Sequence, residues 1–441
     1  MPPGDLPLRT RLGLRASRFA SGLSAALGRG RGTVIGGAIA TRVDPRTLER
    51  LAAGRTTAIV SATNGKSTTT AMLAAAARTL GPVAHNGGGS NMESGLIVAL
   101  DGARRAPIAI LEADELYLGP LARATHPCVI TLMNLARDYL ERGVRYKRLV
   151  RHWRDTFTRV DWPLTIVANA DDPLVVWSLR PVMVGGDGPD RDAGLAPVRL
   201  VWVAGGHRWA GDGLVCRDDL VALQRDGPDW WCEVCGRRRP GSTWSLAEGI
   251  VHGPGIDQAL DLGMPGDVNE VNALFALITA VELGIPADVA ARSFTGVVDV
   301  DGRYGRRMLD GRAIRLLLSK NPASWQESVN IIEATEEPVV FDITARGDLN
   351  ARDTSFVWEA PIERLAGRRV IATGIRAHDI ALRLETAGLE VTAIPDPFDA
   401  IRACPPGPVT VATNYPAFLE LRDALPREAD ASTRATAEVA S

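Results

Sequence analysis

One loop constrains the fold of this chain more than any other segment. Residues 62–68 read A-T-N-G-K-S-T and lie between an apolar run that predicts a strand over 57–61 and an Ala-rich run that predicts a helix over 68–80. A glycine-containing loop of this kind presents backbone N–H groups and a helix amino terminus to phosphate oxygens. The segment therefore predicts an α/β domain with a nucleotide site at the carboxyl end of a strand.

The side chains of this loop have different expected roles. Lys66, expected to be exposed in the loop, would reach the β and γ phosphates as a compact positive charge, and the Ser67 hydroxyl would ligate Mg²⁺. The other loop residues that we expect to bind nucleotide are Thr63, Asn64, Gly65 and Thr68.

Beyond the loop, short apolar runs alternate with helical segments, which predicts parallel sheets covered by helices on both faces. Further strands are expected at 107–112, 128–134 and 164–169, and a second series at 314–318, 339–343, 370–373 and 409–412. A Gly-rich and charged stretch over 299–311 separates the two series. The expected divisions are a helical and Gly-rich arm over 1–50, a nucleotide-binding domain over 51–300, a Rossmann-like C-terminal domain over 301–425 and a flexible tail over 426–441.

Three of the five cysteines lie in a Trp-rich, Gly-punctuated segment that predicts a small β insert over about 205–250. Cys232 and Cys235 form a C-x-x-C knuckle of the kind that binds zinc, but the other knuckle reads Gly213-Leu-Val-Cys216. Cys216, Cys232 and Cys235 therefore supply three thiolates. The fourth zinc ligand stays open among His207, Asp212, Asp218 and Asp219. The alternative is a ribbon without metal that is held by packing of Trp230 and Trp231.

Charge and hydropathy exclude several classes of protein. The 50 Lys and Arg residues nearly cancel the 52 Asp and Glu residues, so no overall field draws the chain to nucleic acid. No apolar run approaches the roughly 18 residues of a membrane span. Arginines interrupt the segment in which a secretory leader would be apolar, at Arg9, Arg11, Arg15 and Arg18. We expect a cytoplasmic protein that is at most peripherally attached to a membrane.

Four further motifs follow the loop in the order found in the Mur ligase superfamily, whose members activate a carboxylate with ATP and then add an amine. They are L-E-A-D-E at 111–115, N-L-A-R-D at 134–138, N-A-D-D-P at 169–173 and N-E-V-N-A at 269–273. Taken singly, Glu112 could end a strand in solvent and Asn272 could cap a helix. Taken together, the motifs resemble the superfamily. The resemblance implies that Glu112 binds Mg²⁺ and is catalytic with Lys66, that Asn269 and Asn272 hydrogen-bond adenine, and that Arg303 contacts the nucleotide.

Four stretches resemble one branch of the superfamily, the MurT branch, and the similarity spans about residues 8–425. They are Gly36-Gly37, Cys232 to Pro240, Lys320 to Trp325 and Arg352 to Trp358. The resemblance implies a Mur-ligase-type P-loop ATPase domain with a zinc-ribbon-like β insert, followed by a Rossmann-like α/β domain. The implied cofactors are ATP, Mg²⁺ and Zn²⁺.

The MurT resemblance also implies a reaction. It is the ATP-dependent amidation of the D-glutamate α-carboxylate of lipid II to D-isoglutamine through an acyl phosphate, with ammonia from a separate GatD-like glutaminase. None of the five cysteines lies in a G-x-C-x-G nucleophile turn, so the chain has no evident glutaminase of its own. A lipid-carried substrate would place the protein at the inner face of the membrane.

Several residues depart from the family pattern. Ala62 stands where the family has glycine, and a positive φ there would strain the loop. Asn350 and Phe356 replace an acid and a tryptophan, which leaves Asp353 as the candidate acid that completes the partner's Cys-His pair. A turn or cap aspartate is the alternative. Two other functions remain open: a stand-alone Mur or folylpolyglutamate-type amino-acid ligase, and a degenerate scaffold that binds the partner without turnover.

Overall fold

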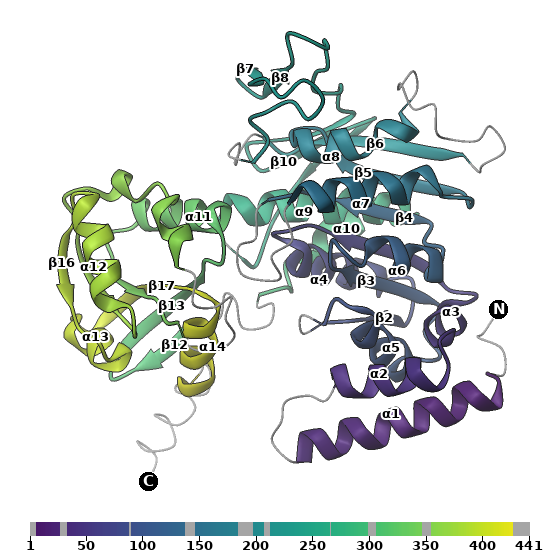
Figure 1. Cartoon of the computed structure of the whole chain (residues 1–441), viewed down its shortest axis with the longest axis horizontal. Coiled ribbons are helices and arrows are strands. Elements are labelled where there is room, and N and C mark those ends of the chain that lie inside the picture. The colour runs from purple at the N-terminus through teal and green to yellow at the C-terminus, as the bar shows by residue number, and fades with distance from the viewer. Residues whose placement is uncertain are drawn as a thin grey trace. The chain divides into compact units, whose positions relative to one another are not determined.

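The structure is a computed structural model that describes residues 6–26, 33–87, 90–136, 146–183, 197–206, 212–264, 266–298, 306–345 and 354–426. The chain divides into two compact units (Figure 1). Unit 1 comprises Met1–Ala136 and Tyr146–Val297, and the described residues of unit 2 begin at Val298. Among the described residues, no helix is both long and apolar enough to cross a membrane.

Unit 1 is built on a nine-stranded sheet in the order β11-β10-β9-β6-β5-β4-β1-β3-β2. The strands are β1 Thr56–Ser61, β2 Val83–His85, β3 Ile108–Ala113, β4 Val129–Leu132, β5 Leu164–Asn169, β6 Val198–Ala204, β9 Trp244–Ala247, β10 Ile250–Gly253 and β11 Ile256–Ala259. All pairs are parallel except those that β10 makes with β9 and β11. Every residue of β3 is buried, as expected for a parallel strand covered on both faces.

Helices cover both faces of this sheet (Figure 1). On one face α4 packs against α9 and α10, and on the other α6 contacts α7, which contacts α8. The helices are α4 Lys66–Ala77, α5 Glu93–Gly102, α6 Leu118–Thr125, α7 Tyr146–Thr158, α8 Pro173–Ser178, α9 Asp267–Glu282 and α10 Ala287–Phe294. Helix α9 is buried through most of its length, which explains the uninterrupted apolar run over 273–278.

The described residues up to Ala52 form three helices, α1 Leu8–Ala26, α2 Thr33–Val43 and α3 Thr47–Ala52. Gly36 and Gly37, the last glycines of the Gly-rich stretch expected in this arm, lie inside α2. A Cβ on Gly36 would lie 2.1 Å from Ser21 Oγ, and one on Gly37 would lie 2.3 Å from the Cα of Ser94. These glycines therefore allow α2 to pack closely between α1 and α5, where Figure 1 shows it.

The cysteine insert is smaller than the expected span of 205–250. Strand β9 pairs with β6, through Val203 and Trp244, and β10 pairs with β9, so both strands belong to the main sheet. What projects from unit 1 is the segment over 212–243, here called the cysteine ribbon. It contains the two-stranded sheet of β7 Gln224–Asp226 and β8 Asp229–Trp231 (Figure 1).

Unit 2 contains a six-stranded sheet in the order β12-β13-β17-β14-β15-β16, in which only β12 is antiparallel to its neighbour. The strands are β12 Arg306–Leu309, β13 Arg312–Leu318, β14 Val339–Asp342, β15 Arg369–Thr373, β16 Glu390–Ala393 and β17 Gly407–Thr413. The helices are α11 Pro322–Glu333, α12 Ala377–Thr386, α13 Pro397–Ala403 and α14 Tyr415–Ala424.

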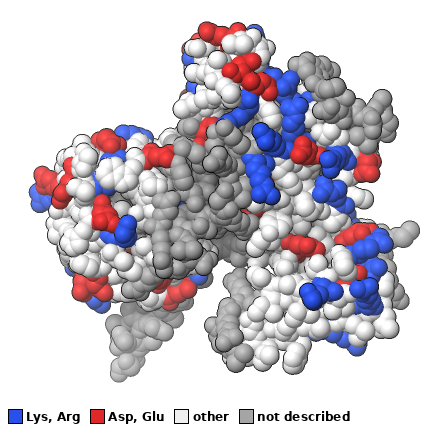
Figure 2. Space-filling model, viewed as in Figure 1, with Lys and Arg blue, Asp and Glu red and all other residues white. Residues whose placement is uncertain are grey.

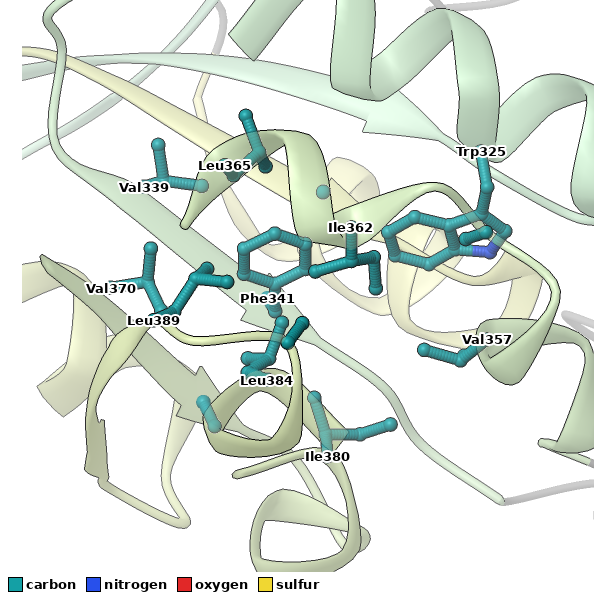
Figure 3. Packing of buried hydrophobic residues seen from close by; sticks show 14 of the residues in the cluster. Trp325, Val339, Phe341, Val357, Ile362, Leu365, Val370, Ile380, Leu384 and Leu389 are labelled. Carbon is teal, nitrogen blue, oxygen red and sulfur yellow. The ribbon is translucent and has the colours of Figure 1, made fainter. Parts of the chain in front are cut away.

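Two of the stretches that resemble the MurT branch contribute aromatic side chains to the core of unit 2. The ring of Trp325 stacks on Phe341 (Figure 3) and on Phe356, with centroids 5.9 and 6.3 Å apart. All three side chains are fully buried. Asn321 caps α11 by accepting a hydrogen bond from the Ser324 backbone N–H at 3.0 Å. The Phe356 substitution is therefore accommodated in the core, whereas Trp358 remains 55% exposed.

Candidate functional site

The predicted phosphate loop joins β1 to α4 and depends on one glycine. Gly65 adopts φ 86° and ψ −13° at the amino end of α4, a left-handed conformation that favours glycine. A Cβ at this position would also lie 2.2 Å from Asn272 Oδ1 of α9. Both the backbone conformation and the close approach of α9 therefore require glycine here.

Ala62 is not strained. The described non-glycine residues with positive φ are His126, Leu220, Glu248 and Asp310, and Ala62 is not among them. Its side chain is fully buried. The loop thus accepts alanine at this position, and the strain considered from the sequence does not arise.

Hydrogen bonds fix the loop to the end of β4. The Asn64 backbone N–H donates to Asn134 Oδ1 at 2.9 Å, and Asn134 Nδ2 donates back to the Asn64 carbonyl at 2.9 Å. The Thr63 hydroxyl accepts from the Ala136 backbone N–H at 3.0 Å. The next two residues of the 134–138 motif, Arg137 and Asp138, lie outside the described residues.

Lys66 is buried, contrary to the expectation of an exposed loop lysine. Its Nζ donates to the Ala62 carbonyl at 2.8 Å and lies 3.4 Å from Glu115 Oε2. Sequence reasoning did not select Glu115, although it is the last acid of the 111–115 motif. The acid was visible in the sequence, but the proximity of its side chain to Lys66 was not.

Ser67 and Glu112 supply oxygen atoms near the same edge of the sheet. Ser67 Oγ is buried and has no hydrogen-bond partner among the described residues, which costs about 1–3 kcal/mol unless a ligand binds it. Glu112 pairs with Val60 in the β1–β3 register, so it lies beside the end of the strand that leads into the loop. Its Oε1 accepts from Asn91 Nδ2 at 3.2 Å. A hydroxyl and a carboxylate are donors that fit Mg²⁺.

Asn269 and Asn272 lie together on buried turns of α9. Asn272 Nδ2 donates to Asn269 Oδ1 at 3.3 Å, and the Asn272 carbonyl accepts from the Thr69 hydroxyl at 3.3 Å. The structure thus brings Asn272 against the phosphate loop, and the contact of both side chains with adenine stays a prediction. Two other predicted site residues, Arg303 and Asp353, lie outside the described residues.

The cysteine ribbon holds a second cluster. The ligand atoms of Cys216, Cys232, Cys235 and Asp219 all lie within 4.8 Å of one another. The Sγ atoms of Cys216 and Cys235 are 3.8 Å apart, and Asp219 Oδ2 lies 3.2 Å from the Sγ atoms of Cys216 and Cys232. A tetrahedron with Zn–S bonds of about 2.3 Å has edges of about 3.8 Å, so the donor set fits zinc.

The local electrostatics of this cluster suit a cation. Local desolvation, reinforced by the Asp219 carboxylate, raises the pKa of the Cys235 thiol to about 12, and burial raises the pKa of Cys216. Hydrogen bonds from Cys235 and its neighbours lower the pKa of Asp219. A bound divalent cation would reverse the effect on the thiols, because it stabilises thiolates.

Of the other proposed fourth ligands, the two described ones, Asp212 and Asp218, do not join the cluster. Asp218 accepts from Arg180 Nη1 at 2.9 Å and pairs with Arg237, Asp212 lies outside the cluster, and His207 is not among the described residues. A Cβ on Gly213 would lie 2.8 Å from Pro173 Cδ, so a cysteine there would displace the start of α8. The structure therefore favours Asp219 in place of the missing cysteine.

The ribbon is also attached to unit 1 through protein contacts. Trp230 is buried and its Nε1 donates to the Ala170 carbonyl at 3.1 Å, while Arg239 pairs with Asp171 at 2.7 Å. Both acceptors belong to the 169–173 motif. The next residue of that motif, Asp172, caps α8 and is partly buried, and desolvation by the surrounding protein raises its pKa to about 6.

Comparisons with known proteins agree with this architecture. Residues 318–418 match the family described as MurT ligase C-terminal. Over 399 residues the chain is 26% identical to "Lipid II isoglutaminyl synthase (glutamine-hydrolyzing) subunit MurT" of Staphylococcus aureus strain N315, covering 86% of this chain and 89% of that protein.

Two solved structures show the same fold. A pseudomurein peptide ligase type C from Methanothermus fervidus has a TM-score of 0.61 at 18% identity and covers 84% of this chain and 78% of its own. MurF ligase from Thermotoga maritima in complex with ADP has a TM-score of 0.57 at 16% identity, covering 86% and 82%. The expected Mur-ligase-like α/β fold is confirmed, with parallel sheets and a cysteine-rich cluster consistent with a zinc ribbon.

Proposed function

Because the chain is a member of the MurT family within the Mur ligase superfamily, we propose that it is the synthetase subunit of a lipid II isoglutaminyl synthase. The proposed substrate is the α-carboxylate of D-glutamate in the peptidoglycan precursor lipid II. The γ-phosphoryl group of ATP is transferred to this carboxylate, and ADP leaves. Ammonia then attacks the acyl carbon and loses a proton, and the carbon–oxygen bond to phosphate breaks, which gives D-isoglutamine and inorganic phosphate.

The geometry of the phosphate loop is the observation that carries this proposal. Loop N–H groups and the amino end of α4 bind phosphate oxygens, and Lys66 moves from Glu115 to the transferring phosphate. Ser67 and Glu112 would hold Mg²⁺, which neutralises phosphate charge when bound. The buried Ser67 hydroxyl without a described partner supports an active site over a degenerate scaffold.

The ammonia is proposed to come from a separate GatD-like glutaminase. In the structure Cys216, Cys232 and Cys235 form the ribbon cluster, and Cys404 caps the carboxyl end of α13 and is buried in the core of unit 2. The Cys128 thiol donates to the Thr57 carbonyl at 3.3 Å at the start of β4. Each cysteine therefore has a structural role in place of that of a catalytic nucleophile. This supports glutamine hydrolysis by a partner and not by this chain.

The test is amidation of lipid II by the purified chain, alone and co-expressed with a GatD-like partner, with ammonium or glutamine as nitrogen source. The chain alone is expected to form ADP and amidated lipid II with ammonium. Glutamine should serve only when the partner is present. If the chain instead joins an amino acid to the substrate carboxylate, it is a stand-alone ligase. If no ADP forms with either nitrogen source, it is a scaffold.

A further inference from the structure

The first helix of unit 1 presents its larger apolar side chains to solvent. Exposed fractions on α1 are 66% for Leu8, 52% for Leu12, 76% for Phe19 and 52% for Leu23. The side that faces the protein is made mostly of smaller residues, namely Thr10, Gly13, Leu14, Ser17 and Ser24. This is the reverse of the usual surface helix, which buries its apolar stripe.

The exposed side chains form one narrow row. At about 100° per residue, Leu8, Leu12, Phe19 and Leu23 fall within a sector of roughly 60° and extend along roughly 22 Å of the helix. The same projection places Arg15 directly at the edge of the row. The row is a convex ridge, because α1 packs mainly against α2 and forms the outermost helix of unit 1 (Figure 1).

The charge of this region has a single sign. Between residues 6 and 43 the sequence has seven arginines and neither aspartate nor glutamate, although the whole chain has a net charge of −2. The surface over α1, at the lower end of unit 1 in Figure 2, is accordingly white and blue. Arg18 anchors the helix through Asp101 at 2.7 Å, whereas Arg11 and Arg15 form no ion pair with a described residue.

We propose that α1 docks unit 1 on an anionic lipid bilayer. The helix lies in the plane of the interface, with Leu8, Leu12, Phe19 and Leu23 among the acyl chains. Arg11 and Arg15 extend along the border of the row to the lipid phosphates. An apolar ridge bordered by unpaired cations complements an anionic interface, whereas a protein partner would need a groove with matching acidic groups. The inference is independent of the proposed reaction, since it requires no nucleotide, partner or lipid II.

The experiment is vesicle co-sedimentation of the full chain without nucleotide or lipid II. The protein is expected to sediment with vesicles of phosphatidylcholine and phosphatidylglycerol in equal amounts, and much less with phosphatidylcholine alone. High salt should weaken binding, because it screens the arginine contribution. Absence of binding to the anionic vesicles would overturn the proposal.

Variants locate the binding surface. Leu12→Glu and Phe19→Glu are each expected to lower the vesicle partition coefficient about tenfold or more, because each replaces an apolar side chain that inserts among the acyl chains with a charged one. Arg15→Gln should lower it about fivefold. Matched controls are Leu382→Glu on α12, where Leu382 is 60% exposed, and Arg78→Gln at the end of α4, and both should bind like the parent chain.

All three α1 side chains are exposed, so these substitutions leave the core unchanged, and unaltered thermal unfolding verifies this. Equal binding by the parent chain and by Phe19→Glu would contradict the proposal. A concentration-dependent dimer that Phe19→Glu dissociates would assign the ridge to self-association instead. If the parent chain binds vesicles but does not amidate lipid II, the proposed function is contradicted and the proposed lipid docking is not.

Discussion

At the scale of single residues, Lys66 shows how the proposed site keeps a buried charge compensated. Its ammonium group lies 3.4 Å from Glu115 and 2.8 Å from the Ala62 carbonyl. A buried lysine without these partners would be strongly destabilised. Phosphate can replace Glu115 as the counter-charge, so the lysine has a negative partner both before and after nucleotide binds.

We predict that Lys66→Met abolishes ADP formation, lowering the rate at least about a thousandfold, because methionine keeps the apolar stem but supplies no charge to the transferring phosphate. The same change leaves Glu115 unpaired and should lower the melting temperature. The double variant Lys66→Met/Glu115→Gln should regain stability while staying inactive. Appreciable ADP formation by Lys66→Met would remove the assigned role.

Asp219 makes the second residue-scale prediction. If its carboxylate replaces the missing cysteine, Asp219→Ala should lose zinc and lower the melting temperature, whereas Asp219→Cys should retain zinc through a fourth thiolate. Asp218→Asn is the matched control, because Asp218 pairs with arginines outside the cluster. Metal analysis of protein purified with zinc checks these outcomes. Equal zinc content in Asp219→Ala and the parent chain would exclude this ligand.

At the scale of elements, the sequence predicted most central strands because their apolar runs are long and bounded by turn residues. It missed α2, whose T-V-I-G-G-A-I-A-T-R-V sequence is rich in glycine and β-branched residues. This helix forms because close packing against α1 and α5 outweighs weak intrinsic propensity. It also assigned β9 and part of β10 to the insert, since pairing of β9 with β6 across the ribbon is a long-range property that local patterns do not encode.

Gly37 provides a test of that packing. Gly37→Ala is expected to destabilise unit 1 by about 1–3 kcal/mol, since the new Cβ would lie 2.3 Å from backbone atoms of Ser94. Gly22→Ala on α1 is the control, because a Cβ there meets no atom within 4 Å. It should be neutral or stabilise the helix by up to about 1 kcal/mol. Denaturant unfolding measures both, and equal effects would show that α2 does not need glycine.

The cap of α8 gives unit 1 a pH dependence. Burial raises the pKa of Asp172 from 3.8 to about 6, so the folded state holds its proton after the unfolded state has lost it. Stability from this group is therefore fully present below about pH 4 and falls by up to about 3 kcal/mol as the pH rises to about 6.

We predict that Asp172→Asn, which cannot ionise, flattens this part of the pH profile. Its melting temperature should fall less between pH 4 and 6 than that of the parent chain, on top of a constant loss from the altered cap. Asp288→Asn on α10 is the control, since Asp288 is an exposed acid with the opposite shift in pKa. Parallel profiles for Asp172→Asn and the parent chain would contradict the assignment.

At the scale of the whole molecule, the sequence showed which residues belong to a site more readily than which residues contact one another. The loop, the three clustered cysteines and the buried asparagines of α9 were all selected from the sequence. The roles of Glu115 and Asp219 could be assigned only from the structure. Several acids lie near each of them in the sequence, and only the fold shows that Glu115 contacts Lys66 and that Asp219 contacts the thiols. The contacts with nucleotide and lipid II remain predictions.

If one protein hydrolyses glutamine and this chain activates the carboxylate, variants should fall into two classes. One class should lose only glutamine-dependent amidation, and the other should lose amidation with either nitrogen source. If Asp353 orients the histidine of the partner's glutaminase, Asp353→Asn should lose glutamine-dependent amidation but retain amidation with free ammonium. Lys66→Met is the control that should lose both. Equal loss of both activities in Asp353→Asn would place Asp353 in the synthetase site or the folding core.

The long-range support of the phosphate loop has a consequence for biosynthesis. Thr69, in the first turns after the loop, bonds to Asn272, and these residues are 203 positions apart in the chain. At about 5–20 residues per second, translation separates them by roughly 10–40 s. During that interval the nascent chain has its ATP loop but not α9, the helix against which the loop packs. Nucleotide can therefore stabilise only a chain translated past α9, and truncation before Asp267 should leave a ribosome-released fragment that ATP does not protect from proteolysis.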